Sequence, residues 1–414
     1  MKPIYRKLFG TGVLALVIGN SLPGMAKPVA PPPPFPTWLQ ALMAEAEARG
    51  VGKTTLEHAL RGVKPIPRVI ELDRRQPEFT LTLGSYFKKA ISAERIVKGK
   101  KMLKKHAPLL RRVFERYGVQ PRFLVAFWGL ESNYGQYTGV FPVVGALVTL
   151  AHDRRRAAFF RQQLLAVLQL IDKGHFPPAV RGSWAGAMGN HQFIPTTYRD
   201  FAVDFDRDGK RDLWNSLPDI FASAANYLSK SGWQKDRTWG REVQLPRSFD
   251  VGLSGLEIQK SLAEWNILGV RQVNGKPLPD VVVDDASILL PAGYRGPAFL
   301  VYKNYRTTMI WNRSHLYALA VGHLSDRLVG KGKLRAELGD INPLSRHDIL
   351  DLQRRLNALG FNAGKPDGRV GPMTSKAIKK YQRRHSLPAD GFPNSQLIEH
   401  IKNSRELSDN HKIQ

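Results

Sequence analysis

"FWGLESNYG", residues 127–135, places one carboxylate, Glu131, at the end of an apolar run and follows it with small polar residues and glycine. The run begins near Pro121 and predicts a buried helix, which Asn133 and Gly135 are suited to end. A carboxyl group in an apolar wall has a raised pKa, because the loss of water disfavours its ionised form. Glu131 could then hold a proton near neutral pH and act as a general acid. A glutamate that points to solvent at a helix end is the alternative from local sequence alone.

The charge of the chain is unusual for an enzyme. Its 414 residues carry a formal net charge of +27, and 43% of them are hydrophobic. This length and hydrophobic content allow a sizeable core and predict two or three folded units. A surface so basic attracts polyanions, which include nucleic acid, anionic lipid and an acidic cell-wall polymer. Charge alone does not choose among them.

The N-terminal residues predict export. Lys2, Arg6 and Lys7 precede an apolar stretch over residues 8–18, and small residues follow near residue 26. This is the pattern of a secretory signal peptide, which we expect over residues 1–26 with cleavage at its end. The apolar stretch is shorter than the roughly 20 residues that span a bilayer, so we expect no stable membrane anchor. The sequence holds no cysteine, so neither a disulfide nor a lipid-modified cysteine is expected, and a bacterial periplasm fits best. Export argues against a nucleic-acid partner.

Changes in composition divide the chain into segments and predict an α+β architecture dominated by helices. "SAERIVKGKKMLKKHAPLLRRVFERYG" predicts one long helix from Ser92 to Gly118. "REVQLP", "DVVVDDASILLP" and "AFLVYKNY" are β-branched runs bounded by Pro and Gly, so they predict strands of a small sheet. "DILDLQRRLNALG" has leucines on one helical face and opens a compact unit of three helices. The expected segments are a signal peptide at 1–26, a Pro-rich linker at 27–36, a helical domain at 37–330 with a β-rich part at about 240–305, a linker at 331–344, a small module at 345–403 and a flexible tail at 404–414.

Two further stretches mix residues that suit a sugar cleft. "GSWAGAMGNHQFIPTTYRDFAVD", residues 182–204, sets Ser183, Gln192 and Phe193 among small residues that let a backbone approach a ligand closely. A glycine-rich loop with no special use is the alternative. "MIWNRSHLYALAV" gathers Trp311, Asn312 and Tyr317, and such residues stack on sugar rings or simply pack at the start of a helix.

"DFDRDGKRDLWNSLPD", residues 204–219, resembles the opening of a calcium loop. Carboxylates stand at positions 1, 3 and 5, and Gly209 stands at position 6, where a sharp turn is needed. Position 12 is Asn215 instead of the expected glutamate, so another acid must close the site. The expected metal is structural Ca²⁺, and its expected ligands are Asp204, Asp206, Asp208, Lys210 and Asp219. A solvated acidic turn is the alternative.

Together these stretches resemble the membrane-bound lytic murein transglycosylase B family. "GLESNYG" is similar to its catalytic-glutamate motif and "GSWAGAMGNHQFIPTTY" to its glycine-alanine stretch, and the metal loop and the helix after it match as well. The resemblance runs from about Thr37 to Arg327. The last unit, with "LQRRLNALGF" and "PDGRVGPMTSKAIKKYQ", resembles the peptidoglycan-binding module often attached to wall enzymes.

The resemblance implies a lysozyme-like catalytic domain that cleaves the β-1,4 bond between N-acetylmuramic acid and N-acetylglucosamine without adding water. Glu131 would give a proton to the glycosidic oxygen and then take one from the muramyl 6-hydroxyl, which closes a 1,6-anhydro ring. This differs from the two-carboxylate scheme of most glycosidases. By motif match, the residues expected to line the cleft are Tyr86, Arg156, Ser183, Gln192, Phe193, Tyr227, Asn312 and Tyr317.

The chain departs from the family pattern in several places. Asn190 and His191 stand where the family often has an aromatic residue and a glycine, and Trp311 replaces a usual tyrosine. The metal loop is one residue longer before Asp219. Without a lipid-attachment cysteine, the family's membrane attachment does not carry over to this sequence.

Two other functions compete with the transglycosylase. A goose-type lysozyme-like hydrolase shares the single-glutamate chemistry and would leave a reducing end. A non-catalytic peptidoglycan-binding protein would rely on its basic surface and C-terminal module. In every case the expected partner is peptidoglycan, and we expect the protein to be a monomer without an organic cofactor.

Overall fold

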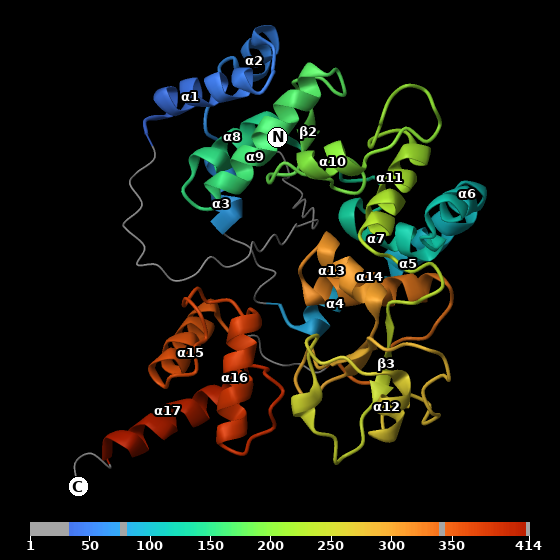
Figure 1. Cartoon of the computed structure of the whole chain (residues 1–414), viewed down its shortest axis with the longest axis vertical. Helices are drawn as coiled ribbons and strands as arrows, with labels where there is room; N and C mark the ends of the chain where they lie inside the picture. Colours follow the sequence, from blue (N-terminus) through green and yellow to red (C-terminus); the bar gives the residue numbers. More distant parts are fainter. Residues whose placement is uncertain (1–32, 75–80, 339–343, 411–414) are drawn as a thin grey trace, which may run out of the picture.

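The structure is a computed structural model that describes residues 33–74, 81–338 and 344–410, with side chains described as far as Ser404 (Figure 1). The signal peptide expected over residues 1–26 lies outside the described residues. Within them, no helix combines the length and apolar character needed to cross a membrane.

Helices form most of the chain that precedes the β-rich part. α1 begins inside the expected Pro-rich linker, because Pro34 caps the helix and Pro36 fits its first turn, where a missing N–H is tolerated. Phe35 packs against the hydrophobic core, so the unpacked linker ends earlier than residue 36. The helices before the β-rich part are α1 Phe35–Ala48, α2 Lys53–Leu60, α3 Pro67–Arg74, α4 Leu83–Ala90, α5 Ala93–Lys105, α6 Ala107–Tyr117, α7 Pro121–Ser132, α8 Val143–His152, α9 Ala157–Asp172, α10 Pro195–Phe201 and α11 Leu217–Lys230.

The single helix expected between Ser92 and Gly118 is wrong, since the chain forms α5 and α6 there. His106 ends the first helix and caps the second, and Pro108 lies in the first turn of α6. Proline in the interior of one continuous helix would remove a backbone hydrogen bond and clash with the preceding turn. The break lets both α5 and α6 contact α7.

α7 runs through the middle of the helical domain. Every residue from Phe123 to Ser132 is buried, and the helix contacts α5, α6, α11 and the later helix α14, which spans His315–Leu328. Figure 1 shows these helices around α7. A helix that is apolar on all sides is stable only inside a core, so the glutamate at its end enters the interior with it.

The β-rich part forms a four-stranded antiparallel sheet in the order β4-β3-β6-β5. Its strands are β3 Gly240–Gln244, β4 Arg271–Gln272, β5 Ser287–Leu289 and β6 Ala298–Val301. The 3-10 helix η2 Val251–Leu253 and the helix α12 Leu262–Ile267 lie between them in the chain. A smaller pair joins β1 Phe141–Pro142 to β2 Arg181–Gly182.

Two of the strand predictions are too long. In "DVVVDDASILLP" only Ser287–Leu289 is a strand, and Val281 and Val282 are exposed despite their β-branched side chains. "AFLVYKNY" ends as a strand at Val301, because Lys303 already begins the helix α13, which ends at Trp311. Directly after β6, Tyr302 N donates a backbone hydrogen bond to Trp239 O at 2.9 Å. The change from strand to helix brings Trp311 back toward α7.

The C-terminal module has a small core of its own. Its helices are α15 Arg346–Ala358, α16 Pro372–Arg384 and α17 Ser395–Asn410. Leu352, Leu356, Ile378 and Tyr381 are buried together, as the helical spacing predicts. The segment 404–410, expected to belong to a flexible tail, continues α17, because no Pro or Gly interrupts "SRELSDN".

Candidate active site

Glu131 occupies the last turn of α7 and only 6% of it is exposed. The helix ends immediately beyond it, since Asn133 adopts a left-handed conformation with φ of 52°. Ser132 stabilises the turn, and its Oγ accepts a hydrogen bond from Gly135 N at 2.9 Å. The small polar residues after Glu131 therefore stop the helix without covering the carboxylate.

Two aromatic residues from the later part of the chain donate hydrogen bonds to Glu131. Trp311 Nε1 lies 2.9 Å from Glu131 Oε1, and Tyr317 OH donates to the same oxygen in a short hydrogen bond. Trp311 ends α13 and Tyr317 lies in the first turn of α14, so the break between these helices holds both donors in place. Glu131 is thus oriented by residues 180 and 186 positions away in sequence.

Burial raises the pKa of Glu131 from 4.5 to about 7, and the hydrogen bonds from Tyr317 and Trp311 oppose this rise. Loss of water is the dominant cause, because an ionised carboxylate in an apolar pocket lacks the solvation it has in bulk. Among the described residues, no second carboxylate contributes to the shift. The carboxyl group is therefore poised to hold or release a proton at neutral pH.

Aromatic rings form the wall beside Glu131. The ring centroid of Trp311 lies 4.6 Å from that of Phe127, 5.0 Å from that of Tyr227 and 5.5 Å from that of Phe193. Phe193 is fully buried, whereas Tyr227 is half-buried and its hydroxyl donates to Ile310 O at 3.4 Å. The structure thus brings two predicted cleft residues, Phe193 and Tyr227, together around Trp311.

The glycine-alanine stretch folds back on itself next to this wall. Ser183 Oγ accepts hydrogen bonds from Ala185 N at 3.3 Å and Ala187 N at 3.0 Å, so it shapes the turn from within. Gln192 adopts a left-handed φ of 51° and donates to Gly189 O at 2.9 Å. Gly189 itself leaves no room for a side chain, since an added Cβ would lie 2.6 Å from Leu213 O. Ser183 and Gln192 therefore stabilise the fold of this loop through hydrogen bonds to its own backbone.

The other predicted cleft residues divide into two groups. Tyr86, on α4, lies close enough to Tyr317 to raise its pKa, and Asn312 is buried directly after Trp311, where its Oδ1 accepts from Ser314 N at 3.1 Å. Arg156 instead forms a short ion pair with the buried carboxylate of Asp73, which also binds Arg155. The described contacts thus place Arg156 with α3 rather than with Glu131.

Sequence reasoning missed two residues of this site. It treated Trp311 as an aromatic surface for sugar and did not include it among the cleft residues, although it is a hydrogen-bond donor to Glu131. It also missed Asn190, whose Oδ1 accepts from Trp128 Nε1 at 2.7 Å and whose Nδ2 donates to Trp214 O at 2.8 Å. The signal was the departure of both positions from the family pattern. Asn190 joins α7 to Trp214, which lies in the acidic loop of residues 204–219.

His191, the other departure in this stretch, is buried and neutral. Its ring centroid lies 6.0 Å from that of Trp311, and burial lowers its pKa to about 4. It extends the apolar support behind Trp311 without adding charge near Glu131.

The acidic loop gathers four carboxylates from Asp204, Asp206, Asp208 and Asp219, with one oxygen of each within 4.8 Å of the others. Asp204 accepts hydrogen bonds from the backbone of Arg207, Asp208 and Gly209, which winds the loop around it. The positive φ of 86° at Gly209 permits this turn.

Asp219, the last residue of the acidic loop, lies in the first turn of α11 and is fully buried. Phe205 N donates to its Oδ1 at 2.6 Å and Asp212 N to its Oδ2 at 2.9 Å. Burial raises the pKa of Asp219, the two backbone donors oppose the rise, and Asp206 and Asp204 add to it. Repulsion among carboxylates held this close is relieved by a bound cation, and oxygen ligands suit Ca²⁺. Asp219, which sequence spacing alone did not fix, fits the cluster.

Comparison with known proteins gives two family matches. Residues 34–326 match the family described as the transglycosylase SLT domain, and residues 345–401 match a putative peptidoglycan binding domain. The membrane-bound lytic murein transglycosylase B of Escherichia coli (strain K12) is 30% identical over 289 residues, which cover 66% of this chain and 78% of that protein.

Solved structures extend the similarity to the whole described fold. The crystal structure of SltB3 from Pseudomonas aeruginosa in complex with NAG-anhNAM-pentapeptide is 46% identical, covers 89% of this chain and 99% of that one, and has a TM-score of 0.85. The Escherichia coli lytic transglycosylase Slt35 in complex with calcium is 28% identical, covers 70% of this chain and 92% of that one, and has a TM-score of 0.61. The helix-dominated fold with a small β-rich part and a helical C-terminal module is confirmed. Since the first family match spans most of the sequence and contains Glu131 and the acidic loop, the chain belongs to the transglycosylase SLT domain family.

Proposed function

We propose that this protein is a lytic transglycosylase that cleaves the β-1,4 bond between N-acetylmuramic acid and N-acetylglucosamine in peptidoglycan and leaves a 1,6-anhydromuramyl end. The observation that carries this proposal is the burial of Glu131, with a pKa near 7, beneath Trp311 and Tyr317. The relatives act as a guide to the substrate, because one solved relative binds NAG-anhNAM-pentapeptide and another binds NAG-NAM-pentapeptide.

Glu131 would act first as the acid. Both aromatic donors bind Oε1, so the proton of the neutral carboxyl belongs on Oε2. That proton would pass to the glycosidic oxygen as the bond from the anomeric carbon to this oxygen breaks, and the N-acetyl oxygen of the substrate would stabilise the positive anomeric carbon. A group with a pKa near the working pH is suited to proton transfer in both directions.

Glu131 would then act as the base. Its carboxylate, held by Trp311 and Tyr317, would take the proton of the muramyl 6-hydroxyl while that oxygen bonds to the anomeric carbon. The proton given in the first step is recovered in the second, so no water is consumed. The absence of a second carboxylate from the causes of the pKa shift, among the described residues, supports this scheme over one that needs two acids.

The remaining cleft residues would bind the glycan. The half-buried Tyr227 offers a ring for stacking on a sugar face, the buried rings of Phe193 and Trp311 support it from behind, and Ser183 and Gln192 shape the loop beside them. We include Tyr86, Asn312 and Tyr317 in the same cleft. Arg156 would bind the substrate only from its position beside Asp73, where 18% of its side chain is exposed.

Product analysis of wild-type digests tests the proposed reaction. Peptidoglycan sacculi digested with this protein should yield fragments whose muramyl ends lack the mass of one water, and chemical reduction should leave them unchanged. Reducible ends would instead identify a hydrolase, and the failure to release any fragment would favour a wall-binding protein without catalytic activity.

We further propose that the acidic loop binds Ca²⁺ through Asp204, Asp206, Asp208 and Asp219, with the backbone carbonyl of Lys210 at position 7 of the loop. The ion would be structural. Asn190 connects Trp214 in the loop to Trp128 in α7, the helix that carries Glu131, so an ordered loop would support that helix. The calcium complex of one relative supports this choice of metal.

Calcium should stabilise the folded protein. A ligand that binds only the folded loop at a hundredfold excess over its Kd adds about 2.7 kcal/mol to the free energy of unfolding, so Tm should rise when Ca²⁺ replaces a chelator. The D204A/D208A double variant should lose this response, whereas D200A/D236A removes the same charge from exposed positions elsewhere and should keep it. An unchanged wild-type Tm at millimolar Ca²⁺ would contradict the metal site.

We also propose that the protein works in the periplasm, where its substrate lies, after export by the N-terminal signal. The basic charge of the chain suits an anionic wall polymer, and the relatives are enzymes of peptidoglycan.

A further inference from the structure

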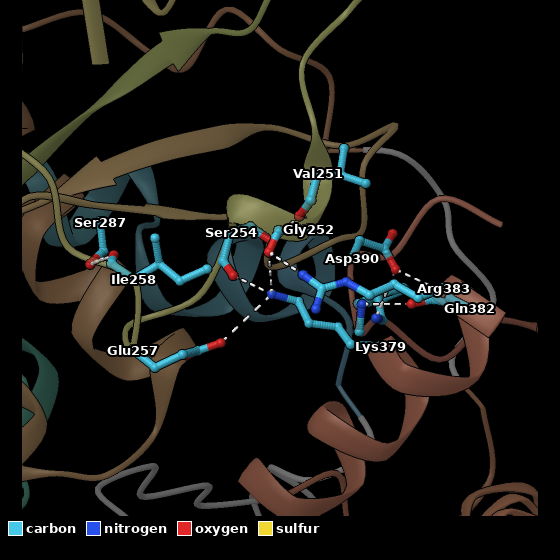
Figure 2. Close-up of polar contacts among 12 residues, drawn as sticks. Val251, Gly252, Ser254, Glu257, Ile258, Ser287, Lys379, Gln382, Arg383 and Asp390 are labelled. Atoms are coloured by element: carbon cyan, nitrogen blue, oxygen red, sulfur yellow. Dashed lines mark hydrogen bonds and ion pairs between the residues drawn. The ribbon is translucent and has the colours of Figure 1, made fainter. Parts of the chain in front are cut away.

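The helix α16 of the C-terminal module presents different side chains on its two faces. Ile378 and Tyr381 are buried in the core of the module. Lys379 and Arg383, one turn apart, point the other way, toward the β-rich part of the catalytic domain (Figure 2). The second face therefore contacts a part of the chain that precedes it by more than a hundred residues.

Lys379 is the centre of this contact. Its Nζ donates a short hydrogen bond to Ser254 O, lies 3.4 Å from Gly252 O and lies 3.7 Å from the carboxylate of Glu257 (Figure 2). Only 13% of the lysine side chain is exposed. Burial of a charged lysine is costly unless hydrogen-bond acceptors replace the water that it loses. The three acceptors around Lys379 therefore indicate a specific contact.

The backbone of the β-rich part is shaped to receive these donors. The short helix η2 ends at Leu253. The carbonyl groups of Gly252 and Ser254 are not used in the hydrogen bonds of this helix, and both accept from Lys379 of the module. Arg383 also donates to Gly252 O, at 3.2 Å. Gly252 does not need a positive φ, yet an added Cβ there would lie 2.8 Å from both Arg383 Nη2 and Asp250 Oδ1. Glycine at this position thus permits close approach of the module.

A second loop of the β-rich part reaches the same module. Tyr294 N donates to Asp390 Oδ2 at 2.9 Å, and a Cβ on Gly293 would lie 3.1 Å from the ring of Phe392. Asp390 is fixed inside the module, since its other oxygen accepts from Gln382 Nε2 at 2.8 Å. Two separate loops therefore bind two separate parts of the module, which fixes orientation as well as position.

The linker before the module is also attached to the β-rich part. Both oxygens of Glu242 accept backbone hydrogen bonds, from Ala336 N at 2.7 Å and Arg335 N at 2.8 Å. Only residues 339–343 then separate the described chain of the catalytic part from Leu344. A short connection raises the effective concentration of the module at its docking surface to the millimolar range, so a few good contacts suffice to hold it there.

We propose that the C-terminal module is docked on the β-rich part through Lys379, Arg383 and Asp390, and acts as a fixed second wall-binding surface at a constant orientation to Glu131. The docking itself stands on the contacts alone. Its use, to present wall polymer to the cleft in one register, rests on the proposed function. A module on a free tether would instead hold the enzyme near the wall without directing the glycan.

The distance between the two parts tests the docking in the full chain. The sequence has no cysteine, so I267C in α12 and E399C in α17 provide two unique sites for spin labels at exposed positions. Electron-electron dipolar spectroscopy should give one narrow distance distribution. K379E places a carboxylate against two carbonyl oxygens and should broaden the distribution about twofold or more, and K379M, which removes the donor but keeps the stem, should broaden it as well.

The neighbouring K380E is the matched control, because Lys380 carries the same charge on the same helix but is exposed. It should leave the distribution narrow. Circular dichroism with unchanged helix content would show that the module of each variant is folded. Distributions for both K379E and K379M as narrow as that of the control would overturn the docking.

Activity assays then test what the docking is for. K379E should cleave short soluble glycans as fast as K380E, because Lys379 lies apart from the Glu131 cluster, yet release about fivefold less material from intact sacculi. Equal release by the two variants, together with a broadened distance in K379E, would overturn the role in presenting the polymer. If digests made with the wild-type protein contained no anhydro products, the proposed function would be overturned instead. The distance measurement would still decide the docking.

Discussion

E131Q is expected to release glycan fragments from sacculi roughly a thousandfold more slowly than wild type, because removal of a group that acts as both acid and base costs about two to four orders of magnitude in rate. Glutamine has the same shape and retains an oxygen that can accept from Trp311 and Tyr317, the two donors to Glu131. The cleft and the C-terminal module should therefore be intact, so the variant should still bind sacculi. Turnover measured by the appearance of soluble fragments checks the rate, and sedimentation with sacculi checks the binding.

E115Q is a suitable control for this variant. This variant makes the same substitution, glutamate to glutamine, at an exposed position of α6. It should leave the rate unaltered. If E131Q kept more than about a tenth of the wild-type rate, another group would have to supply the proton, and the assignment of Glu131 would be wrong.

The local part of this site was predictable from sequence. A run that is apolar on all sides and ends in "ESNYG" predicts a buried helix with a carboxylate at its end, and of the two orientations left open for Glu131, α7 adopts the buried one. The loop with carboxylates at positions 1, 3 and 5 likewise forms from short-range backbone contacts. Both features depend on residues close in sequence, where spacing carries geometry.

The long-range part was not predictable in the same way. Spacing along the chain does not say which aromatic side chain reaches the carboxylate, and Trp311 and Tyr317 do so because α13 follows directly on β6 and returns to α7. The same limit explains the strand that was expected to continue through Tyr305, since tertiary packing decided where β6 gave way to α13. Arg156 was expected in the cleft from its motif, but its partner Asp73 lies 83 positions earlier on α3, where no pattern marked it.

The docking of the C-terminal module is a further case of this kind. The three helices were evident from their apolar faces, which determine the core of the module. The hydrogen bonds of Lys379 are with backbone carbonyl groups, and every residue has such a group. The exposed Glu257 also lies 3.7 Å from Lys379 Nζ, but it is one of several acidic residues in the β-rich part, so residue type alone did not identify the partner.

The second large effect that we expect is a change in how stability depends on pH. Burial raises the pKa of Glu131 from 4.5 to about 7 in the folded protein, so the folded state binds this proton more tightly than the unfolded state does. The resulting stabilisation is fully present below pH 4.5 and is lost as the pH rises through about 7. A shift of this size corresponds to about 3 kcal/mol in the free energy of unfolding.

E131Q isolates this contribution, since an amide does not ionise. Relative to wild type, the variant should gain stability as the pH rises from 5 to 8, by up to about 3 kcal/mol in the free energy of unfolding, because only the wild type must then keep an ionised carboxylate among Trp311, Tyr317 and Phe127. Thermal unfolding of both proteins at a series of pH values gives this difference, in which groups common to both cancel. A difference between E131Q and wild type that does not change with pH would mean that Glu131 ionises in the folded protein as it does in water, and a glutamate of that kind could not hold the proton that the cleavage of the glycosidic bond requires.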